Sequence, residues 1–392
     1  MADQKRIYFP NLNGIRFIAA FMVLYDHVKH FKWLYKIDNW QFPIKTSVGD
    51  LGVTLFFVLS GFLITYLLLE EQKEFGKIQL RFFYMRRVLR IFPLYYLIVI
   101  LAFFLLPHFI SIPGFVREDA IYHSDKATEL LPDQDPYFYK KFALFLLFLP
   151  NLCYVIHDLV PFASQLWSVG VEEQFYLFWP TLLILFKKRI LVVFIIVLFS
   201  ITCLILFLNN LPHKASLAAE FSVLNSFLAY FRIDAMAMGG IMAYFLFKKK
   251  IRFLTILYSW EVQLIILSSI IILIAFNLEF GNWTQLVYAM FFSLLILNLA
   301  SNPKSIVNLE HPILSYLGKI SYGLYVYNPL AIILSIHISL FIFKGESIGF
   351  NIVLFACSVI LTIAISALSY RFFEAKFLNL KKGFSKVLSN RY

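Results

Sequence analysis

The stretch NGIRFIAAFMVLYDHV, residues 13–28, predicts the first membrane-spanning helix of the chain. It is apolar except for Arg16 near one end and Asp26 and His27 near the other. Arg16 and His27 are eleven residues apart, three helical turns and a small remainder, so they share one face about 16 Å apart along the axis. Ionisable groups inside spans usually face a bundle interior or a wet cavity. The alternative is that both side chains snorkel to the two membrane interfaces.

The composition indicates an integral membrane protein. Of the 392 residues, 60% are hydrophobic and 15% are charged, whereas soluble chains average about half apolar and about a quarter charged. The net charge of +12 does not point to nucleic acid, because Lys and Arg clusters between spans set membrane topology. We expect no nucleic-acid partner. The three cysteines are far apart and match no metal-ligand spacing, so we expect no metal site and no disulfide.

Apolar runs and basic clusters together predict ten transmembrane helices. The apolar runs cover residues 13–30, 51–69, 88–109, 166–186, 190–208, 221–247, 258–277, 284–300, 313–341 and 347–371. A further run, residues 141–156, is interrupted by Pro150 and would rise only about 24 Å as a helix, short of the roughly 30 Å of the hydrocarbon core. If that run does not cross, every basic cluster falls on the cytoplasmic side, as the positive-inside rule prefers.

We therefore expect an all-α integral membrane protein with about ten transmembrane helices and both termini cytoplasmic. Residues 1–380 are expected to form a single transmembrane domain, and residues 381–392 a short basic cytoplasmic tail. Residues 110–165 are expected to be extracytoplasmic and to contain a short interfacial or re-entrant segment. No cleaved signal peptide is expected, because Arg16 interrupts the first apolar run. The expected location is the cytoplasmic (inner) membrane, with multiple crossings.

Three arginines mark the cytoplasmic end of the third predicted span, in FYMRRVLRIFP at residues 83–93. Arg86 and Arg90 are four residues apart and Arg87 and Arg90 three, so both pairs are neighbours on the helix surface. Arginine suits phosphate because its planar fork donates bidentate, charge-assisted hydrogen bonds. The alternative is a purely topological cluster, which the positive-inside rule would also produce.

Two glutamates lie about a turn and a half inside another predicted span, in QLWSVGVEEQFYLFWP at residues 165–180. A carboxylate at that depth is costly and usually functional. Glu172 shares one helical face with Ser168 and Tyr176, whereas Glu173 follows it in the chain. The alternative is an interfacial glutamate beside an aromatic belt.

Two more stretches place polar groups within spans. GVTLFFVLSGFLIT, residues 52–65, contains Ser60 and Gly61, and small residues of this kind let helices approach closely, so a structural role is favoured. FRIDAMAMGGIMA, residues 231–243, contains Arg232 and Asp234, which pair with each other or with neighbours. Structural and functional roles are both open for this second pair.

These stretches together resemble the acyltransferase family 3 membrane proteins, which O-acetylate surface glycans. The matching motifs lie between residues 9 and 380 and are the spaced Arg16 and His27, RRVLRIFP, LWSVGVEEQFYLFWP, FFVLSGFLIT, FRIDAMAMGG, ISYGLYVYN and SYRFFEAKF. Two positions depart from the family pattern. Asn328 stands where many members carry histidine, and Ala375 and Lys376 stand where a lysine–proline pair is common. The family's fused esterase-like domain is expected to be absent, because the chain ends soon after the last predicted span.

The resemblance implies a membrane-embedded O-acetyltransferase that moves an acetyl group from cytoplasmic acetyl-CoA to a hydroxyl of an extracytoplasmic or lipid-linked glycan. Acetyl-CoA would be the acyl donor substrate, and no permanently bound cofactor is expected. The partners would be acetyl-CoA, the glycan or lipid-linked saccharide, and the lipid bilayer. The CoA phosphates would be held at the inner face by four residues, namely Arg16, Arg86, Arg87 and Arg90.

The same resemblance implies catalytic roles for His27 and Glu172. A neutral histidine suits proton removal from a hydroxyl, and it can instead carry the acetyl group as a nucleophile. Glu172 would orient the imidazole or stabilise its cation, as the acid of a triad does. The possible supporting residues are Asp26, Ser60, Ser168, Glu173, Tyr176, Arg232, Asp234 and Glu374.

The main alternative is a secondary transporter of a glycan or lipid precursor without acyl-transfer activity. Intramembrane charges suit a transporter as well. Many transporters are built from repeated halves, and the sequence shows no such repeat. Acyl transfer is therefore the favoured interpretation.

Overall fold

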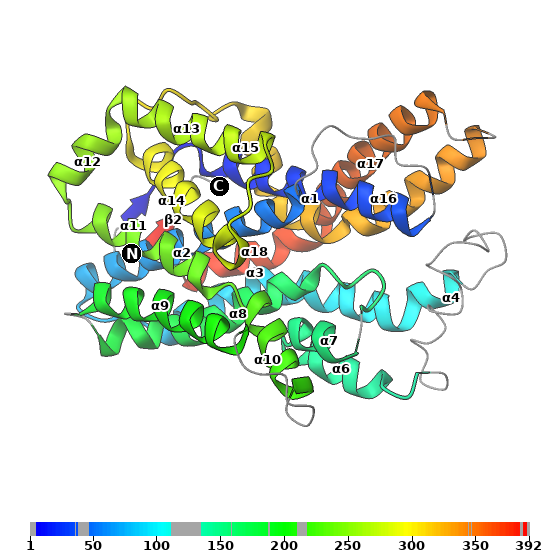
Figure 1. Ribbon diagram of the computed structural model, residues 1–392, viewed down its shortest axis with the longest axis horizontal. Coiled ribbons are helices and arrows are strands. Elements are labelled where there is room, and N and C mark those ends of the chain that lie inside the picture. The colour runs from blue at the N-terminus through cyan, green and yellow to red at the C-terminus, as the bar shows by residue number, and fades with distance from the viewer. Residues whose placement is uncertain are drawn as a thin grey trace.

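The computed structural model describes residues 5–35, 37, 47–110, 135–157, 159–186, 189–209, 218–343, 345, 347–384 and 387–389. Helices make up almost all of these residues, which confirms the predicted helical fold (Figure 1). The exception is one pair of short parallel strands, β1 (Lys5–Ile7) and β2 (Val387–Ser389), which joins the two ends of the chain. Of the predicted tail, residues 385–386 and 390–392 lie outside the described residues.

Each apolar run predicted from the sequence coincides largely with a helix or with consecutive helices. The helices over these runs are α1 (Leu12–Leu34), α2 (Val48–Phe75), α3 (Leu80–Ile100) with η1 (Leu101–Leu105) and α4 (Leu106–Ile110), α8 (Leu166–Leu185), α9 (Ile190–Asn209), α10 (Ala218–Tyr230) with α11 (Ile233–Phe247), α13 (Trp260–Ala275), α14 (Thr284–Ser301), α15 (Pro312–Lys319) with α16 (Ser321–Ile342), and α17 (Ile348–Ser369). The remaining helical elements are shorter and are α12 (Ile251–Tyr258), η2 (Gly281–Trp283), η3 (Tyr370–Glu374), α18 (Ala375–Lys381) and η4 (Lys382–Phe384).

Five helical segments of the described chain are long and apolar enough to cross a membrane. They are Val48–Phe75, Leu80–His108, Gly281–Ser301, Ser321–Ile342 and Ile348–Lys381. The pair α12 and α13 would add a sixth candidate if it forms one span, although its axes bend by 67°. The chain is therefore a helical multi-pass membrane protein.

One predicted span is broken in the structure. The sequence predicts a continuous span over residues 221–247, but α10 ends at Tyr230 and α11 begins at Ile233. Arg232 lies in the break, and its Nε donates 2.9 Å to the carbonyl oxygen of Ala229. The side chain thus satisfies a carbonyl at the end of α10. Hydropathy alone misses this break because both halves are apolar.

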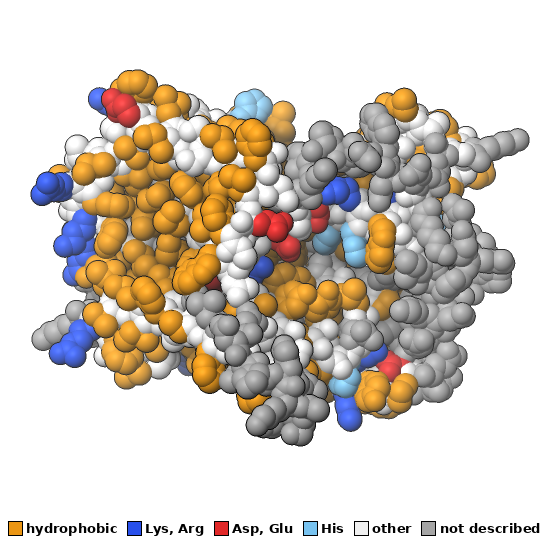
Figure 2. Space-filling model, in the orientation of Figure 1, with side chains coloured by type: hydrophobic (Ala, Val, Ile, Leu, Met, Phe, Trp, Pro, Cys, Tyr) orange, Lys and Arg blue, Asp and Glu red, His pale blue; other side chains and the backbone are white. Residues whose placement is uncertain are grey.

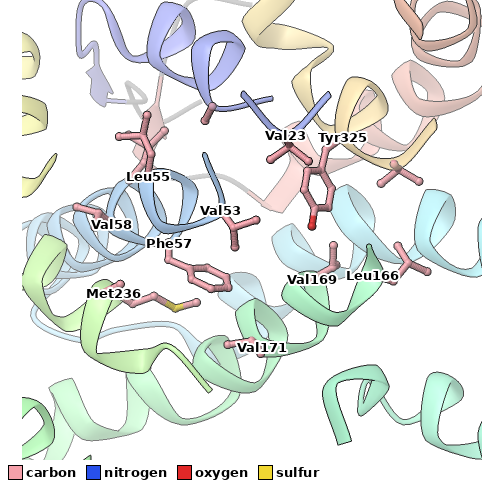
Figure 3. Close-up of a cluster of buried hydrophobic side chains, with 14 of the residues drawn as sticks. Val23, Val53, Leu55, Phe57, Val58, Leu166, Val169, Val171, Met236 and Tyr325 are labelled. Atoms are coloured by element: carbon pink, nitrogen blue, oxygen red, sulfur yellow. The ribbon is translucent and has the colours of Figure 1, made fainter. Parts of the chain in front are cut away.

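Helix α2 is central, and glycines bring its backbone against α11. A Cβ on Gly61 would lie 1.9 Å from the carbonyl oxygen of Met236, and one on Gly239 would lie 2.0 Å from that of Val58. Only glycine tolerates such an approach. Figure 3 shows Met236 packed against the side of α2 that carries Phe57. The predicted close-packing role of residues 52–65 is confirmed at Gly61.

The apolar run at residues 141–156 forms two short helices, α6 (Phe138–Leu146) and α7 (Pro150–His157). Neither is long enough to cross a membrane alone, since they rise about 14 and 12 Å. The turn between them places Phe148 against Tyr95 of α3, with ring centroids 4.2 Å apart. The extracytoplasmic location predicted for residues 110–165 stays a prediction, and residues 111–134 and 158 of that region lie outside the described residues.

The β1–β2 pair lies in the left half of the molecule in Figure 1, and α4 lies at the right-hand end. Figure 2 shows Lys and Arg side chains along the margin where α12 lies, beside a large hydrophobic area. Lys248, Lys249, Lys250 and Arg252, around the start of α12, are exposed. The basic margin and the β1–β2 pair therefore both lie in the half of the molecule opposite α4.

Candidate active site

A pocket opens between α1, α2, α3, α8 and α16, and it encloses about 930 Å³ including the space at its mouth. Seven residues singled out in the sequence line it together, namely Arg16, Ser60, Arg87, Arg90, Ser168, Glu172 and Tyr176. The pocket therefore collects side chains from helices that are far apart in the sequence.

Three arginines make one end of the pocket basic. Arg16 projects from near the start of α1, and Arg87 and Arg90 project from near the start of α3. The Arg87 guanidinium lies over the rings of Phe83 and Tyr176, 5.7 and 5.3 Å from their centroids. Its Nε is buried without a hydrogen-bond partner among the described residues. Arg87 is thus held by its stacking contacts, and an anionic ligand would satisfy its donors.

Arg86 occupies a different place from its neighbours. Its guanidinium donates to the Glu71 carboxylate at 2.9 Å and to the carbonyl oxygen of Phe384 at 3.0 Å. Successive helical residues point about 100° apart, so Arg86 faces away from Arg87. The structure places Arg86 as a link between α3, α2 and the C-terminal segment, and it is absent from the pocket lining.

Glu172 is the acidic centre of the pocket. Its Oε1 accepts hydrogen bonds from the hydroxyls of Ser60 and Tyr176, which also pair with each other. The predicted shared face of Ser168, Glu172 and Tyr176 is confirmed, since all three line the pocket. The hydrogen bonds of Glu172 within the described chain go to these hydroxyls, and it makes no hydrogen bond to His27.

His27 is instead paired with Asn328 of α16. The Nδ1 atom of His27 lies 2.5 Å from Oδ1 of Asn328. The Asn328 side chain is fully buried, and its Nδ2 donates to the carbonyl oxygens of Leu324 at 3.1 Å and Tyr325 at 2.7 Å. The sequence marked Asn328 only as a departure from a family pattern. The available signal was an amide deep inside an apolar run, where polar side chains usually have a partner on another helix.

Tyr325 lies between the pocket and the His27–Asn328 pair. It lines the pocket, and its hydroxyl pairs with Ser168 at 2.6 Å and donates to the carbonyl oxygen of Gln165 at 2.8 Å. Figure 3 shows this hydroxyl pointing toward α8 near Val169. Asn328 is three residues further along α16, about 4.5 Å along the axis. His27 therefore lies about one helical turn beyond the pocket lining, at the end remote from the arginines.

The motifs that line this pocket belong to a known family. A family model described as an acyltransferase domain, that of acyltransferase family 3, matches residues 9–371. The chain belongs to acyltransferase family 3. The family resemblance of the motifs is thereby confirmed over nearly the whole of this chain.

Two relatives show how far the similarity extends. The O-acetyltransferase OatA of Staphylococcus aureus is 27% identical over 401 residues, which cover 96% of this chain and 58% of that protein. The peptidoglycan O-acetyltransferase OatA of Listeria monocytogenes is 29% identical over 192 residues, which cover 47% of this chain and 25% of that protein. The chain thus spans only part of the length of these relatives. No solved structure matches it.

The predicted supporting residues around α1 and α11 lie outside the pocket lining. Asp26 pairs with Lys29 at 3.6 Å in the second half of α1. The Arg232 guanidinium donates to Thr54 of α2 at 3.4 Å, and Asp234 lies in the first turn of α11. In the described part of the chain, no ion pair joins Arg232 directly to Asp234.

The two remaining glutamates have different surroundings. Glu374 accepts a hydrogen bond from Ser369 at 3.1 Å, and Ser369 in turn accepts one from Tyr327 at 3.1 Å. Glu173 has one buried carboxylate oxygen with no hydrogen-bond partner in the described chain, and it is absent from the pocket lining. The functional roles predicted for these residues stay predictions.

Proposed function

We propose that this acyltransferase moves an acetyl group from acetyl-CoA on the cytoplasmic side to a hydroxyl of a glycan on the outer side. One observation carries the proposal: a single pocket leads from three arginines, past the Glu172 cluster, to within one helical turn of His27. The names of the two relatives describe O-acetyltransferases, and one of them acts on peptidoglycan. These names support acetyl as the group and a glycan as the acceptor class.

The donor would enter at the basic end. Arg16, Arg87 and Arg90 would bind the CoA phosphates, since guanidinium groups match phosphate geometry. Helix α2 contributes the apolar Leu63, Ile64 and Leu67 to the pocket lining. The uncharged pantetheine arm of CoA suits such a wall, and its thioester would then point toward His27.

The proposed orientation places both termini in the cytoplasm and the α4 end outside, with about ten crossings. The pairing of β1 with β2 supports an even number of crossings, because it holds both chain ends on one side. The exposed lysines at residues 248–250 lie in that same half of the molecule, and the positive-inside rule makes it cytoplasmic. The location would be the cytoplasmic membrane.

The chemistry requires that a hydroxyl oxygen attack the thioester carbonyl carbon. In the direct route, the C–O bond forms, the C–S bond breaks, the hydroxyl proton passes to His27, and the CoA thiolate then takes that proton. In the two-step route, a His27 nitrogen attacks the thioester carbon, the C–S bond breaks, and CoA leaves as the thiolate. The hydroxyl oxygen then attacks the acetyl carbon, the C–N bond to the imidazole breaks, and the hydroxyl proton passes to the CoA thiolate or to water. Both routes use the same nitrogen of His27.

Acceptor-dependent release of CoA tests the proposed activity. The purified chain would be placed in lipid vesicles with acetyl-CoA and one acceptor at a time. The acceptors would be peptidoglycan fragments, chito-oligosaccharides and the envelope polysaccharide of the cell that produces the protein. With one of these acceptors, we expect the amount of CoA released to equal the amount of base-labile acetate attached to the acceptor. The Arg252→Lys variant, altered on the exposed face of α12, serves as a matched control with unchanged rates. If every acceptor is transported across the vesicle membrane and none is acetylated, the secondary-transporter alternative holds instead.

A further inference from the structure

We propose that Asn328 is a positioning residue that holds His27 as the Nδ1–H tautomer, so that Nε2 is the nitrogen that meets the hydroxyl or the acetyl group. The inference rests on the proposed function for its catalytic consequence. The tautomer itself is a property of the folded chain and can be measured without any substrate.

The orientation of the Asn328 amide is fixed by its own helix. Two backbone carbonyl oxygens, of Leu324 and Tyr325, surround its Nδ2. Carbonyl oxygens only accept hydrogen bonds, so the NH₂ group must face them. A flipped amide would set Oδ1 against two oxygens and lose both bonds. Oδ1 therefore faces His27.

Pro329 explains why a carbonyl is available for this purpose. In a regular helix, the N–H of residue 329 would donate to the carbonyl oxygen of residue 325, but proline has no N–H. Pro329 lies inside α16, so the Tyr325 carbonyl loses its usual backbone donor. The Asn328 side chain supplies the donor at 2.7 Å. Pro329 thus frees a carbonyl for the Asn328 amide, and the resulting hydrogen bond orients Oδ1 toward α1.

The fixed amide then decides the tautomer of His27. An amide oxygen only accepts, so the Nδ1 atom at 2.5 Å must carry the hydrogen. In a neutral imidazole the other nitrogen, Nε2, then keeps its lone pair. Nε2 makes no hydrogen bond to the described residues, and the His27 side chain is partly exposed. The geometry leaves Nε2 ready to accept a proton or an acetyl group.

Asparagine is chemically specific at this position because it offers a donor at one end and an acceptor at the other. Aspartate would keep the acceptor but set a second oxygen against the carbonyls of Leu324 and Tyr325. Leucine has a similar volume and offers neither group. Asn328→Leu should therefore remove the preference of His27 for one tautomer with the smallest change in packing.

Solid-state ¹⁵N NMR of histidine-labelled protein tests the tautomer directly. The chain has eight histidines, and His27→Ala identifies the His27 signals by their loss. At a pH where His27 is neutral, we expect a protonated-type signal for Nδ1 and an unprotonated-type signal for Nε2. The wild-type spectrum alone overturns the proposal if Nε2 carries the proton, so the test does not depend on a variant folding.

The Asn328→Leu variant tests the effect of this contact on catalysis. Asn328→Leu should mix the two tautomers and lower kcat by about tenfold to a hundredfold, by analogy with the loss of side chains that orient metal-bound histidines, while KM for acetyl-CoA stays unchanged. Asn298→Leu is the matched control, because it removes another buried hydrogen bond, to the Leu257 carbonyl, far from His27 in the sequence. We expect it to leave the His27 signals and kcat as in the wild type.

The failures of the two proposals are distinguishable. If Asn328→Leu leaves the His27 signals unchanged, or raises only KM for acetyl-CoA, the positioning role of Asn328 is wrong while the acetyltransferase activity stands. If His27→Ala transfers acetyl at the wild-type rate, the catalytic role of His27 in the proposed function is wrong, whatever its tautomer.

Discussion

Replacing Arg86 should destabilise the fold, whereas replacing its neighbour Arg87 should weaken donor binding. The side chains of Arg86 and Glu71 are 10% and 3% exposed and lie 2.9 Å apart. Removing one partner of a buried ion pair leaves an uncompensated charge and costs about 3–5 kcal/mol. That is a large part of the roughly 5–15 kcal/mol of free energy that usually holds a protein folded. Arg87 stacks on Phe83 and Tyr176, so Arg87→Met should cost about 1 kcal/mol of stability.

The assay is unfolding of the purified chain in detergent–denaturant mixtures, run beside donor saturation curves. Arg86→Met should unfold at much lower denaturant with a normal KM for acetyl-CoA. The double variant Arg86→Met with Glu71→Leu should recover stability, because replacing a whole buried pair by apolar groups is often neutral. Arg87→Met should show the reverse, with near-normal unfolding and a raised donor KM. If Arg86→Met raises donor KM and unfolds normally, the separation of the two arginines is wrong.

Three further predictions concern the donor site, the helix contact and the topology. Arg90→Lys keeps the charge but loses the bidentate fork, so KM for acetyl-CoA should rise while KM for the acceptor stays unchanged. The control variant Arg252→Lys should change neither KM. A donor saturation curve of Arg90→Lys equal to that of the wild type would contradict this. Gly61→Ala must separate α2 from α11 by about 1 Å, since its Cβ would otherwise lie 1.9 Å from a carbonyl oxygen, and a misplacement of about 1 Å can lower activity about a hundredfold. Gly345→Ala, which has open space around it, should be active, and equal activity of the two variants would refute the packing argument. With the native cysteines removed, Lys249→Cys should react with a membrane-impermeant thiol reagent only in permeabilised cells. Labelling in intact cells would contradict the proposed topology.

Local patterns in the sequence predict the helices and the pocket arginines well. Arg87 and Arg90 share a face because they are three residues apart, a spacing that the sequence alone shows. The same rule places Ser168, Glu172 and Tyr176 on one face, and all three line the pocket. Periodicity thus identifies which residues of one helix act together.

Contacts between distant helices are not readable in this way. Arg86 pairs with Glu71 on another helix, and no periodicity within α3 separates it from a phosphate-binding arginine. His27 and Asn328 are 301 positions apart, so their contact depends on the packing of α1 against α16. The family resemblance implies that Glu172 orients His27, whereas the hydrogen bond of His27 in the structure goes to the uncharged amide of Asn328. The break between α10 and α11 is also hidden, since hydropathy averages over it.

Transfer between compartments tests the central claim most directly. Vesicles containing the purified chain would enclose the acceptor glycan that the CoA-release assay identifies, and acetyl-labelled acetyl-CoA would be added outside. The donor is a polyanion that does not cross lipid, so vesicles without protein control for leakage. We predict base-labile label on the enclosed glycan with wild-type protein and none with His27→Ala. Label that forms only when donor and glycan share a compartment, or that forms equally with His27→Ala, would contradict acetyl transfer through this pocket.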